Sequence, residues 1–445
     1  MLMEKLQIKN IMIVIITFFI SSTVTAQQLQ KVTASEDSLD LKWIIQEVIQ
    51  NHPLVKSAEE ALKSADAQIG LAKSGYYPNI NFNANLNNIG PVPSLTIPDM
   101  GTFSFVPRNN ISGDFSLRQN IYDFGKTEQG IAIADEGKSI TEQSKEQVKQ
   151  KLAFRSIQIY YNLDFLQEAI KIKAEQLQTL NEHLDFVQKK KATGSATDYE
   201  VLSTKVKISG VESQLLDLKA SRKVQLSALN ALLGMPSETF HNVKRLLDME
   251  LPDIESDSMI THAYANRNEM LIAKKKEQLA SMQVEMEKTK KTPSLYFIAD
   301  GGIKNGFVPE IKKIRPNYVF GLGVNIPIFD GTREKYNIVK AQSAAETTAL
   351  QTEVTRRDIS SEVVESEAKI QTAAQKVTQS KLQLEQAEEA LSLAKLSYQS
   401  GVITNLDLLD AATAVSESQL QLLKSKIDYV VNIYNLNASL GEKLY

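Results

Sequence analysis

Cysteine is absent from this chain of 445 residues, which excludes disulfide bridges, thiolate metal sites and a lipid-modified N-terminal cysteine. Glycine and proline are scarce, at 19 and 12 residues, so neither a disordered nor a collagen-like chain is expected. Basic residues do not outnumber acidic ones, 50 against 53, and nothing suggests nucleic acid as a partner. The four histidines are scattered without the spacing of metal ligands: they are His52, His183, His241 and His262.

Long apolar runs are also absent after the N-terminus, so no transmembrane helix is expected in the exported protein. The N-terminus carries Lys5 and Lys9, an apolar run from Ile11 to Ile20, and a polar stretch that ends in Val24-Thr25-Ala26. This order is typical of a secretory signal peptide over residues 1–26, with Gln27 as the first residue after cleavage. The apolar run is too short for a bilayer, which needs roughly 20 residues. An uncleaved anchor is the alternative.

The same motifs occur twice along the chain. With an offset of 207 residues, NIYDFGK (120–126) aligns with PIFDGTR (327–333), and LNALLG (229–234) aligns with LNASLG (436–441). Nearer the N-terminus the offset is about 215, as between Pro78 and Pro293. The sequence therefore predicts a tandem duplication, with residues 27–240 as the first repeat and residues 241–445 as the second. Each repeat is expected to run helix, strand, strand, long helix, turn, helix.

Two segments of each repeat alternate apolar and polar residues, which is the pattern of β-strands. A helix from about Leu39 to Ser74 should end at Tyr76-Tyr77-Pro78, since proline disfavours helix in the residue before it. The alternating segments have about 9–12 residues, the length of a transmembrane strand, and four soluble strands packed on the helices are the alternative. The segments are NINFNANLN (79–87), NISGDFSLRQNIY (110–122), SLYFIADGG (294–302) and NYVFGLGVNIPIF (317–329).

Two long segments, Lys126 to Ala192 and Arg333 to Gln399, contain no proline, and each would span about 100 Å as a helix. Spacings of four and three then recur, which is typical of coiled-coil packing. After the second turn this seam comprises Leu409, Thr413, Ser416, Leu420, Leu423, Ile427, Val430 and Tyr434. Before that turn it comprises Leu384, Ala387, Leu391, Ala394 and Tyr398, and the first repeat has a less regular seam at Ile208, Val211, Leu215 and Leu218.

The turn between the two long helices is also made twice. Gly194 and Gly401 can adopt the left-handed conformation that ends a helix. Six residues after each glycine stands an acid, Glu200 or Asp407, and an acid in a first helical turn is favoured by the helix dipole. That local effect alone is one explanation of both acids. The candidate caps of the helices that follow are Thr197 or Asp198 in the first repeat and Thr404 or Asn405 in the second.

Four strands cannot span a membrane alone, because an open sheet leaves edge N–H and C=O groups unpaired in hydrocarbon. A closed barrel needs eight or more strands, so the chain is expected to share a barrel with copies of itself. Two chains would give eight strands and a filled interior, and three would give twelve strands and room for a passage.

The paired motifs resemble those of TolC-type outer membrane efflux proteins, over essentially all of the exported chain. The motifs that carry the resemblance are NHPL (51–54) and NRNEM (266–270), GYYPNI and TPSLYF, NIYDFGK and PIFDGTR, the two glycine turns, and LNALLG and LNASLG. The resemblance implies an α+β membrane protein: a homotrimer with a twelve-stranded β-barrel in the Gram-negative outer membrane and a coiled-coil α-helical periplasmic tunnel. It also implies docking to a periplasmic adaptor, or membrane fusion protein, and to an inner-membrane pump of the RND or ABC type.

The resemblance also implies roles for the turns. They are similar to the hairpin tips where adaptors dock, here Gly194, Thr197, Gly401 and Thr404. Tyr398 matches a tyrosine that helps to hold the channel closed, and Asp407 and Asp410 match aspartates that ring the constriction. The first turn is less typical, with Glu200 in the acidic position and Asp198 beside it. Ile403 stands where the family has a basic residue that forms a salt bridge between chains.

Other functions have weaker support in the sequence. GLGVNI (321–326) lies inside a strand rather than before a helix, so a dinucleotide loop is not expected, and no catalytic triad, enzyme activity or cofactor is predicted. Aromatic residues at strand ends fit contact with outer-membrane lipid, or ordinary packing: Tyr76, Tyr77, Tyr122, Phe124 and Phe329. A periplasmic adaptor-like coiled-coil scaffold and a secreted rod-like protein are the alternative functions. The sequence does not indicate the cargo.

Overall fold

The computed structural model describes residues 38–245 and 258–445. All of these except Ser38 belong to one compact unit, Leu39–Tyr445. The expected signal peptide, residues 1–26, and the new N-terminus at Gln27 lie outside the described residues.

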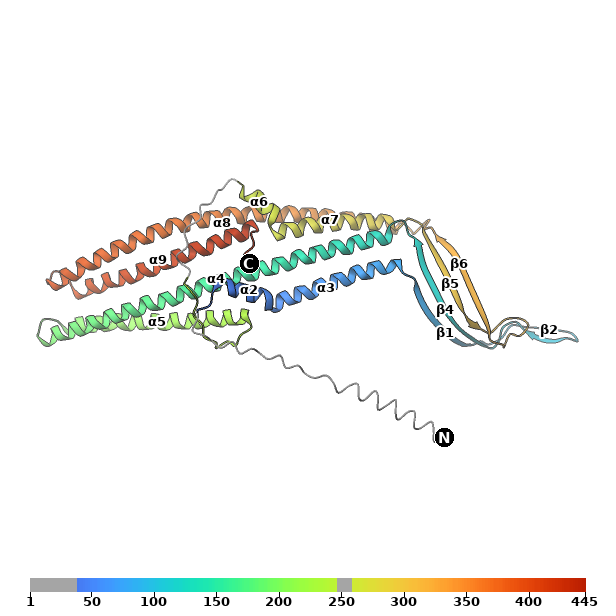
Figure 1. Cartoon of the computed structure of the whole chain (residues 1–445), viewed down its shortest axis with the longest axis horizontal. Coiled ribbons are helices and arrows are strands. Elements are labelled where there is room, and N and C mark those ends of the chain that lie inside the picture. Colours follow the sequence, from blue (N-terminus) through green and yellow to red (C-terminus); the bar gives the residue numbers. More distant parts are fainter. Residues whose placement is uncertain (1–37, 246–257) are drawn as a thin grey trace, which may run out of the picture. The chain divides into compact units, whose positions relative to one another are not determined.

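The order of elements repeats as the sequence predicts (Figure 1). The first repeat contains α2 (Leu41–Asn51), α3 (Pro53–Lys73), a 3₁₀ turn (Ser74–Tyr76), β1 (Asn79–Asn88), β2 (Ser94–Ile97), β3 (Gly101–Ser104), β4 (Asn109–Tyr122), α4 (Lys126–Ala192) and α5 (Asp198–Leu233). The second contains α6 (Met259–Asn266), α7 (Asn268–Thr289), β5 (Ser294–Lys304), β6 (Arg315–Asn325), α8 (Arg333–Gln399) and α9 (Asn405–Leu440).

The prediction of one helix from Leu39 to Ser74 is wrong, because Pro53 divides it into α2 and α3. His52, the residue before the proline, is extended (φ −65°, ψ 133°), and its Nδ1 accepts a hydrogen bond from the N–H of Leu54 at 3.2 Å. The second repeat breaks at the equivalent residue, Arg267 (φ −67°, ψ 130°), without any proline. The break is therefore a feature of the duplicated fold, and Pro53 reinforces it in one copy.

The four expected strands form one antiparallel sheet in the order β1-β4-β5-β6. Their alternation is as predicted: the apolar residues of β1 lie opposite those of β4, as in Phe82 opposite Phe115. The expected length of 9–12 residues holds for three strands, but β4 has 14. The small β2–β3 hairpin between β1 and β4 was not predicted. The two outer strands of the sheet are β1 and β6.

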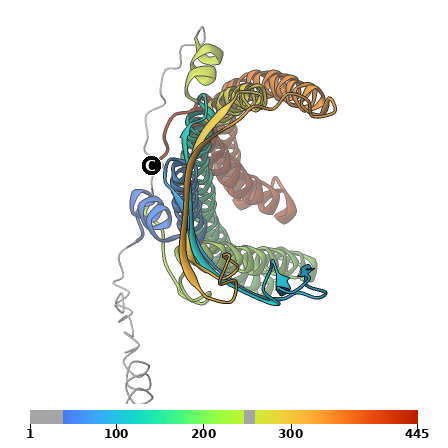
Figure 2. The same ribbon diagram turned by 90° about the vertical axis from the view of Figure 1, so that its right-hand side faces the viewer.

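The long helices α4 and α8 have the predicted bounds and 67 residues each. α5 packs along α4, and α9 packs along α8. Every predicted seam position from Leu409 to Tyr434 is buried or half-buried, and so are those from Leu384 to Tyr398. Seen from the strand end, the helices of this unit follow an open arc (Figure 2).

The main apolar core lies where α2, α4, α5 and α9 meet, with Ile44, Tyr160, Tyr161 and Leu229 fully buried. No helix among the described residues is long and apolar enough to cross a membrane.

Candidate functional site at the hairpin tips

Both hairpin turns are built in the same way. Gly194 (φ +75°) and Gly401 (φ +74°) have the left-handed conformation expected at a helix end. Of the candidate caps, the structure selects the threonines: Thr197 Oγ1 accepts from the N–H of Glu200, and Thr404 Oγ1 accepts from the N–H of Asp407, both at 3.2 Å. Two short polar motifs thus set where α5 and α9 begin.

Each acid also bonds back to its threonine, which completes a capping box. The N–H of Thr404 donates to Asp407 Oδ2 at 2.8 Å, and the N–H of Thr197 donates to Glu200 Oε1 at 3.2 Å. The Thr404 hydroxyl and N–H lower the pKa of Asp407, so this exposed carboxylate is charged throughout the physiological range. Stabilisation of a helix start is therefore a sufficient local explanation of both acids: each completes a capping box, and each stands in the first turn, where the helix dipole favours an acid.

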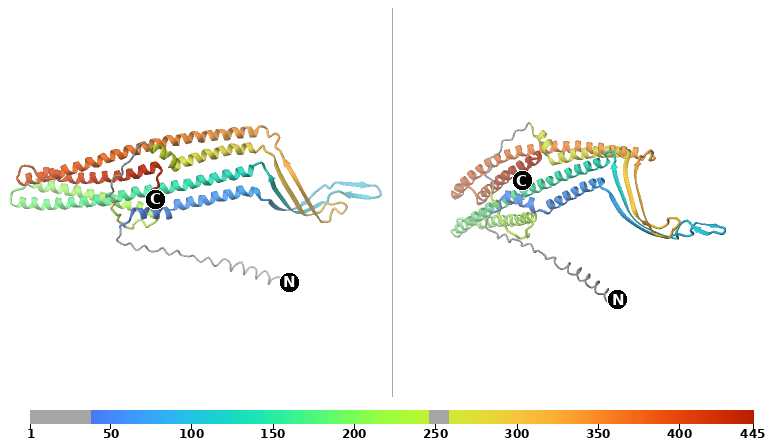
Figure 3. Two further views of the ribbon diagram at one scale, coloured as in Figure 1. Left: turned by 45° about the horizontal axis from the view of Figure 1, so that its top comes forward. Right: turned by 45° about the vertical axis from the view of Figure 1, so that its right-hand side comes forward.

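A tyrosine connects the two tips, which lie side by side (Figure 3). The Tyr398 hydroxyl, at the end of α8, donates to Glu200 Oε2 on α5 at 3.1 Å. Tyr398 is only 6% exposed. Burial, followed by the bond to Glu200, raises the pKa of Tyr398 to about 12, so the phenol stays a donor at physiological pH. Glu200 thus serves both the cap of α5 and the link between hairpins.

A second contact between the tips involves His183, which the sequence did not single out, and Asn405, one of the two candidate caps of α9. His183 Nε2 on α4 lies 2.6 Å from Asn405 Oδ1 on α9. The Asn405 amide in turn donates to the Glu200 carbonyl at 3.3 Å and to Thr204 Oγ1 at 3.2 Å. Asn405 is therefore a bridge between three helices rather than the cap of α9.

The ring of Tyr398 is enclosed from the α4 side. The His183 ring lies 5.7 Å from it, centroid to centroid, and Lys190 Nζ lies 4.7 Å from its centroid. A cation over an aromatic face is attractive, by about 0.5–1 kcal/mol when exposed. No pattern in the sequence marks His183 or Lys190. Only their spacing of seven residues, one heptad, would have placed the two on the same face of α4.

The remaining predicted residues lie at the same end but do not form one cluster. Asp410 pairs with Lys207 of α5 at 2.8 Å, and Asp198 pairs with Lys191 across the first turn. Ile403 is half-buried in the second turn. The contact of Asp410 with α5 is a third link between the hairpins within one chain. Threefold rings of Asp407 and Asp410 would involve three chains and stay a prediction.

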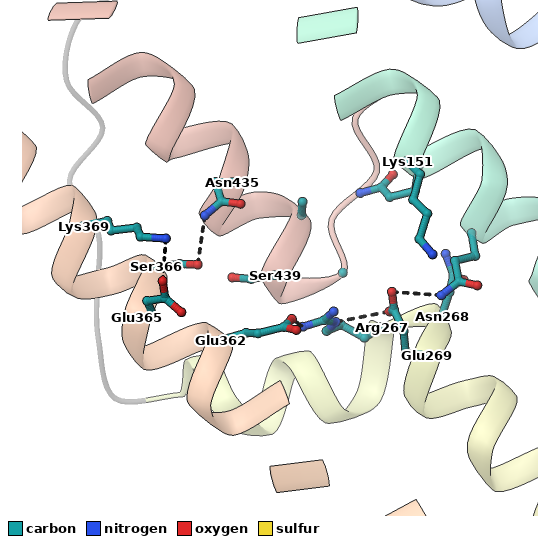
Figure 4. Close-up of a pocket in the computed structure, with 14 residues that line it drawn as sticks. Lys151, Arg267, Asn268, Glu269, Glu362, Glu365, Ser366, Lys369, Asn435 and Ser439 are labelled. Atoms are coloured by element: carbon teal, nitrogen blue, oxygen red, sulfur yellow. Dashed lines mark hydrogen bonds and ion pairs between the residues drawn. The ribbon is translucent and has the colours of Figure 1, made fainter. Parts of the chain in front are cut away.

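A polar hollow of about 260 Å³ lies away from the tips, between α4, the α6–α7 break, α8 and the end of α9 (Figure 4). Arg267, 9% exposed, occupies one wall and pairs with Glu269 at 3.2 Å and with Glu362. Although burial opposes charge, the Gln147 amide and Arg267 lower the pKa of Glu269. The ion pair between Arg267 and Glu362 holds this segment against α8, and the hydrogen bond from Gln147 to Glu269 holds it against α4. Within residues 38–245 and 258–445 no acidic or histidine cluster suited to a metal ion is found.

A sheet with two open edges, continued at one end by two long helical hairpins whose tips meet, defines the subunit of a channel that joins an outer-membrane barrel to a helical tunnel. The sequence profile of the family described as outer membrane efflux protein matches residues 44–235 and 259–442. The chain belongs to this family.

Individual relatives agree with this assignment. The chain is 22% identical to the cation efflux system protein CusC of Escherichia coli, over 90% of this chain and 86% of that protein. It is 20% identical to the alkaline protease secretion protein AprF of Pseudomonas aeruginosa, over 86% and 80%. The crystal structure of the Campylobacter jejuni CmeC outer membrane channel superposes with a TM-score of 0.78 at 17% identity, over 90% and 85%.

The predicted fold class and outer-membrane location are confirmed, and so is the predicted function as an outer-membrane efflux channel. The family and these relatives are channel proteins, and the adaptor-like alternative is not favoured.

Proposed function

We propose that three copies of this chain form the exit duct of a tripartite efflux or type I secretion system. Substrates would pass from an inner-membrane pump, through a periplasmic adaptor, into the helical tunnel and out through the barrel. The observation that carries the proposal is the sheet β1-β4-β5-β6, whose two edge strands have no partner within the described part of the chain. In hydrocarbon such edges must be paired, and three four-stranded sheets close a barrel of twelve strands.

The outward face of β6 supports this placement. Tyr318, Phe320, Leu322 and Val324 alternate along the strand and are each at least 60% exposed in the single chain. An alternating band of large apolar side chains suits contact with lipid. We assign the two duplicated halves, residues 27–240 and 241–445, as repeats that each contribute two strands and one helical hairpin to this assembly.

The hairpin tips serve as the periplasmic gate and the adaptor-docking surface. In this proposal Tyr398 and Glu200 hold the two tips of one chain together, and Asp198, Asp407 and Asp410 supply acidic charge at the mouth. The turns around Gly194, Thr197, Gly401 and Thr404 present the surface that an adaptor would contact. The capping boxes support such a role because they fix the shape of both turns.

The mass of the purified protein in detergent tests the assembly. The proposal expects a stable trimer, and a stable monomer near 50 kDa would overturn it. Insertion of that trimer into planar bilayers should give single channels, whereas a scaffold protein would give none.

The acidic mouth has its own test in the double variant Asp407→Asn/Asp410→Asn. Asparagine keeps an oxygen that can face Thr404 but removes the charge. Six carboxylates around a narrow bore should favour cations and bind trivalent ions. The variant should therefore lose cation preference and block by trivalent ions, while Asp428→Asn, away from the tip on α9, should keep both. If the double variant behaves like the parent channel, the acids only stabilise helix starts.

The type of pump is proposed as RND or ABC. The names of CusC and AprF refer to a cation efflux system and to protease secretion respectively, so both cargo classes occur among the relatives. Val402, 76% exposed in the second turn, is a position for a cross-linking side chain. An adaptor captured in cells through Val402, identified by mass spectrometry together with its pump, would decide between the two types. Capture of neither would count against the docking surface.

A further inference from the structure

Within the chain, the first repeat packs against the second through one surface. The second repeat has an equivalent surface that is not covered by any residue that the structure describes. In the chain, the second strand and long helix of the first repeat, β4 and α4, pack against β5 and α7 of the second repeat. The equivalent surface of the second repeat, β6 and α8, faces no first repeat among the residues that the structure describes, where β6 is an edge strand of the sheet. A further copy of this chain has the required surface, β1 and α3.

The equivalence between repeats can be checked on the sheet itself. The offsets of 215 residues for the first strand and 207 for the second transform the pair Asn79–Arg118 of β1 and β4 into Ser294–Asn325. That pair is observed between β5 and β6. The register of β1 with β4 and the register of β5 with β6 are therefore the same once the offsets are applied. The same offsets can then be applied to the contact between β4 and β5.

We infer that a second copy of this chain adds its β1 to β6 in the register that β5 has with β4. The observed pair Leu117–Ala299 becomes Val324 opposite Ala84 of the partner subunit. The observed pair Phe115–Gly301 becomes Leu322 opposite Leu86 of the partner subunit. This inference rests on the trimer proposed above and specifies which residues meet in it.

The inferred register passes a test that did not enter its derivation. Residues directly opposite each other in a sheet point to the same face, and a slip by one residue would reverse every side chain. Val324 and Leu322 lie on the apolar face of β6, and Ala84 and Leu86 of the partner subunit lie on the apolar face of β1. A slip by one would place these apolar side chains opposite the asparagines of β1.

The junction between strand and helix gives a polar contact in the same frame. Lys126 Nζ, at the first residue of α4, donates to the carbonyl of Thr292 at 2.8 Å. The equivalents are Arg333, at the first residue of α8, and the carbonyl of Tyr77 of the partner subunit. Arg333 is exposed and has no hydrogen bond or ion pair with any residue that the structure describes. The second copy would supply the acceptor that this guanidinium lacks.

The helices extend the contact away from the membrane. Gln147 of α4 donates to Glu269 of α7 at 3.0 Å. The equivalents are Val354 of α8 and Leu54 of the partner subunit's α3. Both are large apolar residues that are more than half exposed in the single chain, at 57% and 56%. A polar contact within the chain is thus replaced by an apolar contact between chains, which removes both side chains from water.

The absence of cysteine makes disulfide trapping a direct experiment. The pair Val324→Cys/Ala84→Cys is introduced in the full chain and oxidised with copper–phenanthroline in outer membranes. The matched control is Leu117→Cys/Ala299→Cys, the equivalent pair within one chain. A slipped pair, Val324→Cys/Asn85→Cys, has side chains on opposite faces. The pair Val354→Cys/Leu54→Cys tests the helical part independently of barrel folding.

We expect most chains of Val324→Cys/Ala84→Cys to run as covalent trimers, since each chain contributes both cysteines to a closed ring. The matched control should form its disulfide without a change in mass, and the slipped pair should give no covalent trimer. If the slipped pair gives covalent trimers, or if both inferred pairs fail while the control oxidises, the register is overturned. If the register fails in this way, the mass of the native protein separates the two proposals. A mass of three chains would keep the proposed trimer and exclude only the register, whereas the mass of one chain would exclude both.

Discussion

Tyr398 joins the two hairpin tips through one hydrogen bond to Glu200, and its loss can be tested without disturbing either turn. A bond to a charged acceptor is worth about 1.5–3 kcal/mol, and less where water screens it. We expect Tyr398→Phe to raise the fraction of time that the channel is open in planar bilayers about tenfold. A loss of about 1.4 kcal/mol from the closed state corresponds to this factor. Glu200→Gln keeps the capping box, because glutamine also completes one, but offers Tyr398 a neutral acceptor, so it should raise the open probability by less than Tyr398→Phe. Equal leak in Tyr398→Phe and the parent channel would exclude a closing role.

Asp164 is the residue whose ionisation should matter most for stability. This residue of α4 has a fully buried side chain, and neither carboxylate oxygen has a hydrogen-bond partner among the described residues. Burial, and then the nearby Glu168, raise the pKa of Asp164 from 3.8 to about 6, against the opposing effect of Arg245 and Lys171. The folded protein therefore holds this proton at a pH where the unfolded chain has lost it.

The sign of the pH dependence follows from the raised pKa. Between about pH 4 and pH 6 the folded state binds more protons than the unfolded state, so stability falls as the pH rises and is constant above that range. The cost is about 3 kcal/mol, since each unit of pKa corresponds to about 1.4 kcal/mol. We expect Asp164→Asn to remove this decrease in a series of thermal melts in detergent from pH 4 to pH 7.5. The exposed Asp428→Asn should melt like the parent protein. A parallel pH series for Asp164→Asn and the parent would contradict the prediction.

At the scale of elements, the αL glycines decide where each long helix ends. Gly401 has φ +74°, and an L-residue there costs about 1–2 kcal/mol. We expect Gly401→Ala to destabilise the α8–α9 turn and to speed hydrogen exchange of the amides at the start of α9. Gly137→Ala inside α4 is the matched control, because alanine there favours the helix by about 1 kcal/mol and has open space around its Cβ. Slower exchange in Gly401→Ala than in the parent protein would show that the turn does not need this conformation.

The elements also show which local signals can be read from a sequence. The first and last residues of α4 and α8 were predicted correctly, from the absence of proline and from the residues that begin and end a helix. Such signals can be read because they act within one turn of a helix. The break between α6 and α7 had no such signal. Arg267 is extended there, buried and paired with Glu269 and Glu362, residues that come close only in the folded chain.

At the scale of the whole molecule, export determines the first residue of the protein in the membrane. Val24 and Ala26 are the small residues that a signal peptidase recognises, so we expect the chain purified from outer membranes to begin at Gln27. N-terminal sequencing or intact mass measurement checks this. Replacement of Ala26 by a large residue should leave the precursor uncleaved, whereas the same change at Gln27 should be tolerated. Recovery of Met1 in the outer membrane would mean that the segment is an anchor.

The sequence by itself determined the duplication, the strand alternation, the two long helices and the identity of the turn residues. These features follow from periodicity and from short-range backbone chemistry, which need only neighbouring residues. Only the tertiary structure decided that Thr197 and Thr404 are the caps, that Asn405 meets His183, that Tyr398 meets Glu200, and that Asp410 pairs with Lys207. The choice of threonine as the cap is made within each turn, where the sequence had allowed either of two neighbouring residues. The partners in the other three contacts lie about 200 residues apart. Their contact depends on how two hairpins of nearly equal length pack side by side, a property of the folded helices that no local pattern encodes.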